Sequence, residues 1–541
     1  MYSLAIYDAF SYPYASKRNV TYAANGMVAT SQPLAAQVGL DILKKGGNAI
    51  DAAIATAACL TVVEPTSNGI GSDCFAIVWM NNQIYGLNGS GQAPQSLSID
   101  AVNKLGYTDE LPRLGMTPVT VPGSPGAWAE LSNRFGVLPF EELLQPAIEY
   151  AENGFPLSPT LAKYWNRAYT KYKNACQGEE FQHWFDTFAP EGRAPQMGEI
   201  WSSKNHAKTL REIALTKSES FYRGNLAQLI DDFFQKHDGF LRKSDLESYK
   251  PIWVNPISID YQGYKVWEIP PNGQGLIALE ALKILEEFNF KEKENIDTYH
   301  KQIEALKLAF VDGMAHITDE KEMKVSASDI LSDSYISTRR AEIKEYAHLP
   351  KPGNPLGGGT VYIASADREG NMVSFIQSNY NGFGSGIVVP NTGIAMQNRG
   401  HNFSLNKEAA NALMPGKRTY HTIIPGFLSK GKNPIGPFGV MGEFMQPQGH
   451  LQVIMNAINF KLNPQSALDA PRWMWKKEKE VFVEPSFSID MAKQLEAKGH
   501  DIQFHLDEGL FGRGQIIWRD PDTGVLQGGT ESRTDGCIAA W

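Results

Sequence analysis

The sequence is poor in basic residues and in cysteine, and it has no long apolar run. Lysine and arginine number 50 against 59 acidic residues, so the formal net charge is -9. Proteins that bind nucleic acid through its phosphates need a basic face, and this balance therefore argues against nucleic acid as the main partner. It leaves room for a small anionic substrate, because a few local cations can hold one.

The four cysteines lie far apart in the sequence and form no C-x-x-C pair. Such spacing indicates neither a metal site nor a disulfide framework. The 11 histidines include no H-E-x-x-H motif and no tight cluster, which gives metal catalysis little support. We therefore expect no metal and no cofactor.

Several recognisable signals are also missing. No G-x-S-x-G marks a serine hydrolase, and no G-x-x-x-x-G-K-[ST] marks a phosphate-binding loop. The N-terminal segment contains no basic stretch followed by an apolar run, and no window approaches the ~20 apolar residues of a membrane-spanning helix. These absences predict a cytoplasmic protein without membrane contact.

The residues that are present are typical of a folded enzyme. Hydrophobic residues make up 42% of 541, enough to bury a large core. Leu34, Val38 and Ile42 share one face of a helix that follows Ser31. Asn48 can cap a second helix at about 50–62, which is apolar nearly all round and is therefore expected to be buried.

The chain changes character at residues 351–359. Before this point most of the pattern is helical, notably at about 157–250, with an apolar strand around residues 75–79. The segment KPGNPLGGG then places two prolines and four glycines within nine residues, and short apolar strands follow it. Helices first and strands afterwards fit one α+β or layered α/β assembly.

A β-hairpin is predicted directly after this junction. Residues 361–367 and 372–378 alternate in the manner of strands, with a turn centred on Glu369 between them. If the hairpin is symmetric about Glu369, Thr360 lies opposite Ser378, and paired side chains are about 4.5–5.5 Å apart at Cβ. A slip of one residue would turn Ser378 to the other face. The same symmetry pairs Ala364 with Ser374 and Tyr362 with Ile376.

Three glycines directly precede Thr360 and suggest a self-cleaving bond between Gly359 and Thr360. A hydroxyl can attack the preceding carbonyl only if the backbone bends, and glycine reaches the strained φ/ψ values that this requires. After an N-to-O acyl shift and hydrolysis, Thr360 would carry a free α-amine with a pKa of roughly 7.7, able to activate its own hydroxyl. The tripeptide taken alone fits a flexible linker before an ordinary strand threonine better.

Longer blocks of sequence narrow these alternatives. In chain order they are ATSQPLAAQVGLDILKKGGNAIDAAIATAACLTVVEP, VPGSPGAW, LQPAIEYAENGFPLS, LESYKPIWVNPISIDYQGYKVWEIPPNGQG, GFGSGIVVPNTGIAMQN, PGKRTYHTIIP, LDAPRW and LEAKGHDI. Together they resemble the γ-glutamyltransferase family of N-terminal nucleophile hydrolases, which includes cephalosporin acylases. The resemblance runs from about Val28 to the C-terminus.

This resemblance implies an α+β fold, a four-layer αββα sandwich in which two central sheets lie between helical layers. It also implies autocatalytic cleavage between Gly359 and Thr360. The products would be a large piece, 1–359, and a small piece, 360–541, which together form one intertwined domain.

The resemblance also implies roles for individual residues. Thr360 matches the family's nucleophile, and Ser378 matches a second hydroxyl that hydrogen-bonds it. Gly442 matches the first of two glycines whose backbone N–H groups form the oxyanion hole, and Glu443 replaces the second. A backbone donor can survive a side-chain change, although a glutamate restricts the loop and adds charge.

The substrate-binding positions depart from the family pattern. The arginine that holds the α-carboxylate of a γ-glutamyl group is replaced by Ser90, and the aspartate that holds its α-amine is replaced by Asn402. Asparagine is neutral and loses the charge-assisted bond. Arg399 could supply a cation from another direction or be a solvated surface charge, and His421 fits a structural role as well as a ligand role. The candidate substrate contacts are Tyr380, Arg399, Asn402, His421 and Thr422.

We therefore expect an autoprocessed γ-glutamyltransferase or glutathione hydrolase-like amidohydrolase. It would cleave γ-glutamyl or related amides of small molecules through an acyl-enzyme on Thr360, with water or an amine as acceptor. An acylase of non-glutamyl amides and a processing-deficient scaffold without activity are the alternatives. A homo-oligomer of processed large and small pieces is left open.

Overall fold

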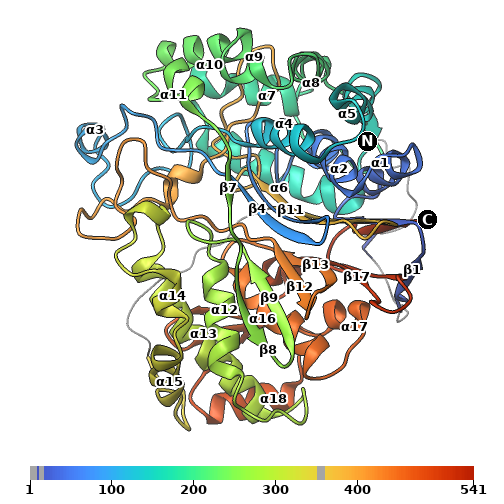
Figure 1. The fold of residues 1–541 in the computed structure, drawn as a ribbon. Coiled ribbons are helices and arrows are strands. Elements are labelled where there is room, and N and C mark those ends of the chain that lie inside the picture. Colours follow the sequence, from blue (N-terminus) through green and yellow to red (C-terminus); the bar gives the residue numbers. More distant parts are fainter. Residues whose placement is uncertain (1–8, 11–16, 350–359) are drawn as a thin grey trace.

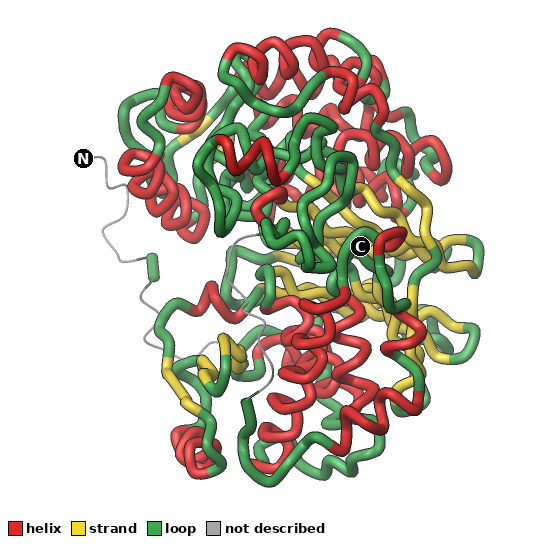
Figure 2. Tube along the Cα trace, turned by 90° about the vertical axis from the view of Figure 1, so that its left-hand side faces the viewer, coloured by secondary structure: helices red, strands yellow, loops and turns green. Residues whose placement is uncertain are grey.

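Two sheets face each other at the centre of the molecule, and helices cover the outer face of each (Figure 1). The computed structural model describes residues 9–10, 17–349 and 360–541. In Figure 2 the strands of both sheets lie between two groups of helices. The four-layer αββα sandwich of the α+β class that the resemblance implied is confirmed.

Each central sheet has seven strands. The order in sheet I is β19 (Cys537–Ala540), β2 (Gly26–Thr30), β10 (Val361–Asp367), β11 (Met372–Ser378), β3 (Asp73–Met80), β4 (Gln83–Gly89) and β7 (Ile252–Val254). The order in sheet II is β1 (Thr21–Ala23), β18 (Leu526–Thr530), β17 (Arg513–Arg519), β13 (Asn433–Met441), β12 (Gly426–Lys430), β9 (Tyr264–Glu268) and β8 (Ile257–Tyr261). Smaller sheets join β14 (Trp473–Lys477), β15 (Glu480–Val483) and β16 (Asp501–Phe504), and β5 (Phe155–Pro156) with β6 (Ile200–Trp201).

The helices divide between the two sides of this sandwich (Figure 1). On the side of sheet I lie α1 (Pro33–Lys44), α2 (Ala49–Val63), α4 (Ser124–Phe135), α5 (Phe140–Asn153), α6 (Pro159–Ala175), α7 (Gln182–Phe188), α8 (Lys204–Thr216), α9 (Glu219–Tyr222), α10 (Asn225–Lys236) and α11 (Lys243–Ser248). On the side of sheet II lie α12 (Gly275–Leu285), α13 (Ile296–His316), α14 (Ala327–Ile330), α15 (Asp333–Ala341), α16 (Met445–Ile458), α17 (Pro464–Asp469) and α18 (Ile489–Ala497), while α3 (Ile99–Lys104) sits at the edge. Among the described residues, no helix is long and apolar enough to cross a membrane.

The first helices form as the sequence predicted. The side chain of Asn48 accepts hydrogen bonds from the N–H groups of Ile50 and Asp51, and Asp51 completes a capping box. Every residue of α2 is buried, because the helix packs between α1, α5 and the strands of sheet I. Its uniformly apolar sequence therefore reflects contact on all sides.

The expected division into helices and then strands is wrong. Of the described strands, β1 to β9 precede the junction, and both sheets combine strands from before and after it. In sheet I, β10 pairs with β2 on one side and with β11 on the other, and β11 pairs with β3. Strands such as β8 and β9 are half exposed and carry polar residues, so they lack the continuous apolar run that marks a buried strand.

The space between the sheets is filled from both of them. Its buried apolar side chains come from strands on both sides of the junction: Met27, Phe75, Ile77, Tyr362, Ile376, Phe427, Met441 and Ile517. The ring of Tyr362 lies so close to Gly439 that a Cβ built on this glycine would be 2.3 Å from it. Any larger residue there would push the two sheets apart.

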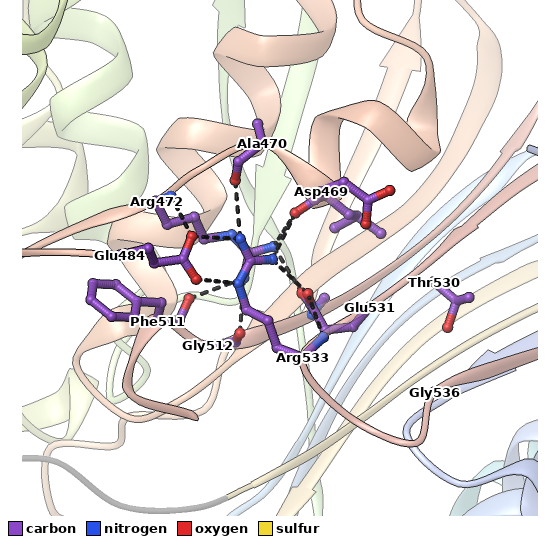
Figure 3. Close-up of polar contacts among 12 residues, drawn as sticks. Asp469, Ala470, Arg472, Glu484, Phe511, Gly512, Thr530, Glu531, Arg533 and Gly536 are labelled. Atoms are coloured by element: carbon purple, nitrogen blue, oxygen red, sulfur yellow. Dashed lines mark hydrogen bonds and ion pairs between the residues drawn. The ribbon is translucent and has the colours of Figure 1, made fainter. Parts of the chain in front are cut away.

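A buried ionic cluster ties the C-terminal segment to sheet II. Arg472 and Arg533 lie between Glu484 and Glu531 (Figure 3). Arg533 donates to both oxygens of Glu484, at 2.5 and 2.7 Å, and to Glu531 at 2.6 Å, while Arg472 donates to Glu531 at 2.9 Å. Burial alone would raise the pKa of Glu531, but the two arginines outweigh it and lower the pKa to about 2.

The same cluster positions a turn that borders the candidate site. A second nitrogen of Arg472 donates to the carbonyl oxygens of Phe511 at 3.0 Å and Gly512 at 2.9 Å. The backbone N–H of Gly514 donates to Glu531 at 2.7 Å. The cluster thus fixes the backbone on both sides of Arg513, the first residue of β17.

We predict that Glu531→Gln costs about 3–5 kcal/mol of unfolding free energy, because it leaves buried arginine charge uncompensated. Glu152→Gln, which removes an exposed partner of Arg211, should cost less than about 1 kcal/mol. Urea unfolding of the two variants and the wild type measures both values. Equal costs would contradict this role for the cluster.

The stability of the folded protein should depend on pH through Glu531. Because the pKa of Glu531 falls from 4.5 to about 2 on folding, its contribution is complete above about pH 4.5 and is lost as the pH falls toward 2. Wild-type stability should therefore drop more steeply over this range than that of Glu531→Gln.

Candidate active site

The hairpin places two hydroxyl groups together in the buried interior. Val361 pairs with Gln377 and Tyr362 with Ile376, which is the register that symmetry about the turn predicts. Thr360 directly precedes β10 and is fully buried. Its hydroxyl donates to the hydroxyl oxygen of Ser378 at 3.1 Å. The predicted contact between these two residues is therefore present in the fold, whereas Gly359 lies outside the described residues.

Ser378 is held in place from the opposite side. Its hydroxyl oxygen also accepts a hydrogen bond of 2.8 Å from the backbone N–H of Tyr380. The chain bends sharply here, because Tyr380 has a φ of 75°, a backbone conformation that residues other than glycine seldom adopt. This strain orients the N–H toward Ser378, so the backbone fixes the position of the oxygen that faces Thr360.

Gly442 occupies a position that only glycine can fill. It follows β13 with a φ of 140°, and a Cβ built on it would lie 3.1 Å from the Cα of Gly512. It also lines a cavity of about 390 Å³. The resemblance implied that the backbone N–H of Gly442 donates to an oxyanion, a role that stays a prediction, and one such donor contributes about 2.7–4 kcal/mol to catalysis.

Glu443 turns its side chain away from solvent. Its φ is 49°, its carboxylate accepts from the amide nitrogen of Asn381, and its carbonyl oxygen accepts from Gln274 at 2.7 Å. Burial raises the pKa of Glu443 to about 8, against the opposing effect of nearby arginines. The carboxyl group is thus mostly protonated at neutral pH, so the glutamate adds little charge to the loop.

Arg399 is buried beside the hydroxyl pair. It lies in a 3₁₀ turn, η3 (Arg399–Asn402), and its guanidinium stacks over the ring of Tyr380 at 4.5 Å. One nitrogen donates to the hydroxyl of Thr422 at 2.7 Å. Burial lowers its pKa only to about 10, so it remains charged. Two of its nitrogens have no hydrogen-bond partner among the described residues. The alternative of a solvated surface charge is thereby excluded.

His421 has a structural environment. Its Nδ1 accepts from the N–H of Ile423 at 3.4 Å, so Nε2 carries the proton and donates to Asp73 at 3.1 Å. The ring packs edge-on against Phe75, and burial lowers its pKa well below the ordinary value. Burial raises the pKa of Asp73 to about 7, although Arg399, 4.0 Å away, opposes this shift. His421 therefore acts on the site by orienting Asp73.

Ser90 and Asn402, the two residues that depart from the family pattern, make different contacts. The hydroxyl of Ser90 donates to Asn88 at 2.6 Å, and Arg418 donates to the carbonyl oxygen of Ser90 at 3.1 Å. A guanidinium from another segment thus contacts the backbone at Ser90. Asn402 is half-buried, and its amide nitrogen donates to the carbonyl of Tyr420 at 3.1 Å. An asparagine can make this bond, whereas a carboxylate cannot.

Sequence reasoning missed Asp73, Asn381 and Arg418. Asn381 lies three residues after Ser378, and Arg418 lies within the block PGKRTYHTIIP, but their partners Glu443 and Ser90 are far away in the chain. Asp73 at the start of β3 carried one available signal, since a charged residue that begins a wholly buried strand requires a partner. The other two could be found only from the fold.

One cluster away from the site has ligating atoms close together. Nitrogen or oxygen atoms of His300, Glu304 and His500 all lie within 4.8 Å of one another. His300 already bonds His500 at 2.9 Å and the carbonyl of Lys344 at 2.8 Å. The buried ammonium of Lys307 donates to Glu304 at 2.6 Å and would repel a cation. This arrangement suits a structural network better than a metal site.

We predict that Ser378→Ala slows both chain cleavage and turnover by roughly tenfold or more, because Thr360 loses its partner and a buried N–H is left unpaired. The matched control is Ser374→Ala on the same strand, where the hydroxyl bonds Tyr362 instead. Fragment appearance on gels and initial rates measure the effect. Unchanged rates in Ser378→Ala would remove this residue from the site.

Comparison with known proteins identifies the family of this chain. The family model described as gamma-glutamyltranspeptidase matches residues 35–541. A glutathione hydrolase-like YwrD proenzyme of Bacillus subtilis is 35% identical over 94% of this chain and 97% of its own. An oxamate amidohydrolase proenzyme of Klebsiella pneumoniae is 31% identical over 96% and 98%. The crystal structure of a cephalosporin acylase from Bacillus halodurans is 66% identical, covers 99% of both chains and has a TM-score of 0.97. The chain therefore belongs to the γ-glutamyltranspeptidase family.

Proposed function

We propose that this chain cleaves itself between Gly359 and Thr360 and then hydrolyses amides through an acyl-enzyme on Thr360. The observation that carries the proposal is the buried hydrogen bond from Thr360 to Ser378 at the start of the hairpin. The relatives named as proenzymes support the processing step.

The proposed chemistry uses only groups of the chain and water. The hydroxyl of Thr360 attacks the carbonyl of Gly359, and the acyl group moves from nitrogen to oxygen. This shift breaks the peptide bond and frees the α-amine of Thr360, which takes up the hydroxyl proton. Water then hydrolyses the ester, which releases a carboxylate at Gly359 and restores the hydroxyl of Thr360. That amine then takes the hydroxyl proton as Thr360 attacks a substrate amide, and Gly442 donates its N–H to the oxyanion. The amine product leaves, and a second water hydrolyses the acyl-enzyme.

Two substrate classes fit the acyl side of the proposed reaction. We propose amides of the γ-glutamyl type or related acyl groups, with water or an amine as acceptor. The relatives that are named glutathione hydrolases support the first class, and the cephalosporin acylase structure supports the second. Ser90 and Asn402 weigh against an unmodified γ-glutamyl clamp, while Arg399 and Arg418 offer replacement cations. The cytoplasmic location expected from the sequence stays a prediction that cell fractionation would check.

We predict that Thr360→Ala remains one uncut chain of about 59.8 kDa without activity, because no hydroxyl can start the acyl shift. Thr360→Ser keeps the hydroxyl and should still yield two fragments. Intact mass spectrometry of the purified proteins distinguishes these states. A cleaved Thr360→Ala protein would refute autoprocessing, and an uncut, inactive wild type would indicate a dormant scaffold.

We predict that Asn402→Asp raises kcat/KM for a γ-glutamyl anilide relative to an uncharged acyl anilide by roughly tenfold, since a carboxylate can bind the α-ammonium group. Asn406→Asp adds the same charge at an exposed position nearby and serves as the control. Initial rates with both anilides give the ratio. No gain would mean that the glutamyl pocket has been rebuilt at more than one point.

A further inference from the structure

The cavity beside Gly442 is strongly cationic in an acidic protein. Five basic residues line it, and one acidic residue does: Arg113, Arg167, Lys171, Lys476, Arg513 and Asp507. The chain as a whole has a net charge of -9. A concentration of positive charge at one cavity, against the sign of the rest of the protein, creates a local field that attracts anions.

Arg513 is the central feature of this cavity. It pairs with Met441 across β17 and β13, one residue before Gly442. Its side chain is 7% exposed, and its guanidinium stacks over the ring of Tyr164 at 4.4 Å. Its Nε has no hydrogen-bond partner, and no carboxylate of the described residues lies within 4.0 Å of its nitrogens. A buried guanidinium without an anion beside it is costly unless a ligand supplies one.

Two further cations face the same space without a carboxylate. Arg113 and Lys171 form no ion pair with any described residue. Burial lowers the pKa of Lys171, and the positive charge of Arg113 lowers it further. The two side chains therefore repel each other across the cavity, and an anion between them would remove this repulsion.

The nearby acids offset the charge of these cations only in part. Asp507 is engaged with Arg167 at 2.9 Å at the rim. Glu64, which acts on Arg513 from a distance, bonds Ser31, and burial raises its pKa to about 7. Glu443 bonds Asn381 and is mostly protonated at neutral pH. The excess positive charge is thus available to a ligand.

We propose that Arg513, with Arg113 and Lys171, binds a carboxylate group carried by the amide substrate. This inference rests on the proposed function, since it concerns the same cavity that borders Gly442. Met474, Phe482 and Leu510 provide an apolar wall, so the substrate combines an apolar chain or ring with a terminal carboxylate. The carboxylate belongs either to the acyl group or to the amine that leaves.

Two matched substrate pairs distinguish these sources. The first pair is glutaryl p-nitroanilide and its monomethyl ester, which differ in charge on the acyl side. The second pair is the pentanoyl amide of 4-aminobenzoate and that of its methyl ester, which differ on the amine side. We expect the processed wild type to prefer the anionic member of one pair by roughly tenfold or more in kcat/KM.

Arg513→Gln should reduce this preference by roughly tenfold, whatever its absolute rate. Arg519→Gln, at the other end of the same strand, should keep the wild-type ratio. Lys171→Gln, on the exposed face of α6, tests the proposal if Arg513→Gln fails to fold, and should lower the ratio in the same direction. An unchanged anionic-to-neutral ratio in the folded variants would overturn the proposal.

A direct measurement of carboxylate binding tests this inference separately from the proposed function. Isothermal titration of processed wild type with glutarate or benzoate should show binding that Arg513→Gln weakens roughly tenfold. Binding without turnover of any amide would refute the function but retain the site. Turnover without a preference in either pair, and without carboxylate binding, would retain the function and refute the site.

Discussion

The pairing of β10 with β11, inserted between β2 and β3, is the constraint on which the rest of the structure depends. Sheet I is continuous only because this hairpin fills its centre, so β2 and β3, which precede Thr360, belong to one sheet only through strands that follow it. The register that completes the sheet is the register that brings Thr360 to Ser378. Both faces of β10 and β11 are buried, so a slip of one residue would turn every side chain of one strand to the wrong buried face and separate the two hydroxyls.

Some buried arginines near this hairpin have acidic partners within the fold, and another has none. Near the C-terminus, Arg472 and Arg533 are balanced by Glu484 and Glu531, and the cluster is satisfied within the fold. On the far side of the adjoining turn, Arg513 has no such partner. The balanced cluster anchors the backbone that presents the unbalanced cation to the cavity, so a rigid internal structure supports a site that is left open to a ligand.

Much of the chemistry near Thr360 could be predicted because it depends on local order. Alternation and symmetry about a turn sufficed to place Ser378 opposite Thr360, and the structure has that contact. The roles of Arg399 and His421 stayed open, because burial depends on segments far away in the chain. Arg399 proved to be a buried cation on Tyr380, and His421 a partner of Asp73. The prediction that the chain before the junction is mostly helical was wrong where its strands are short and half exposed.

The sequence by itself determined the hairpin, the first two helices, the fold class and the contact of Thr360 with Ser378, since these follow from spacing along the chain and from long ordered blocks. Only the tertiary structure decided which cations meet at the cavity. Arg113, Lys171 and Arg513 are hundreds of residues apart or belong to different elements, and no short-range pattern links them. Electrostatic effects depend on distance in space and on burial, and both are properties of the packed fold.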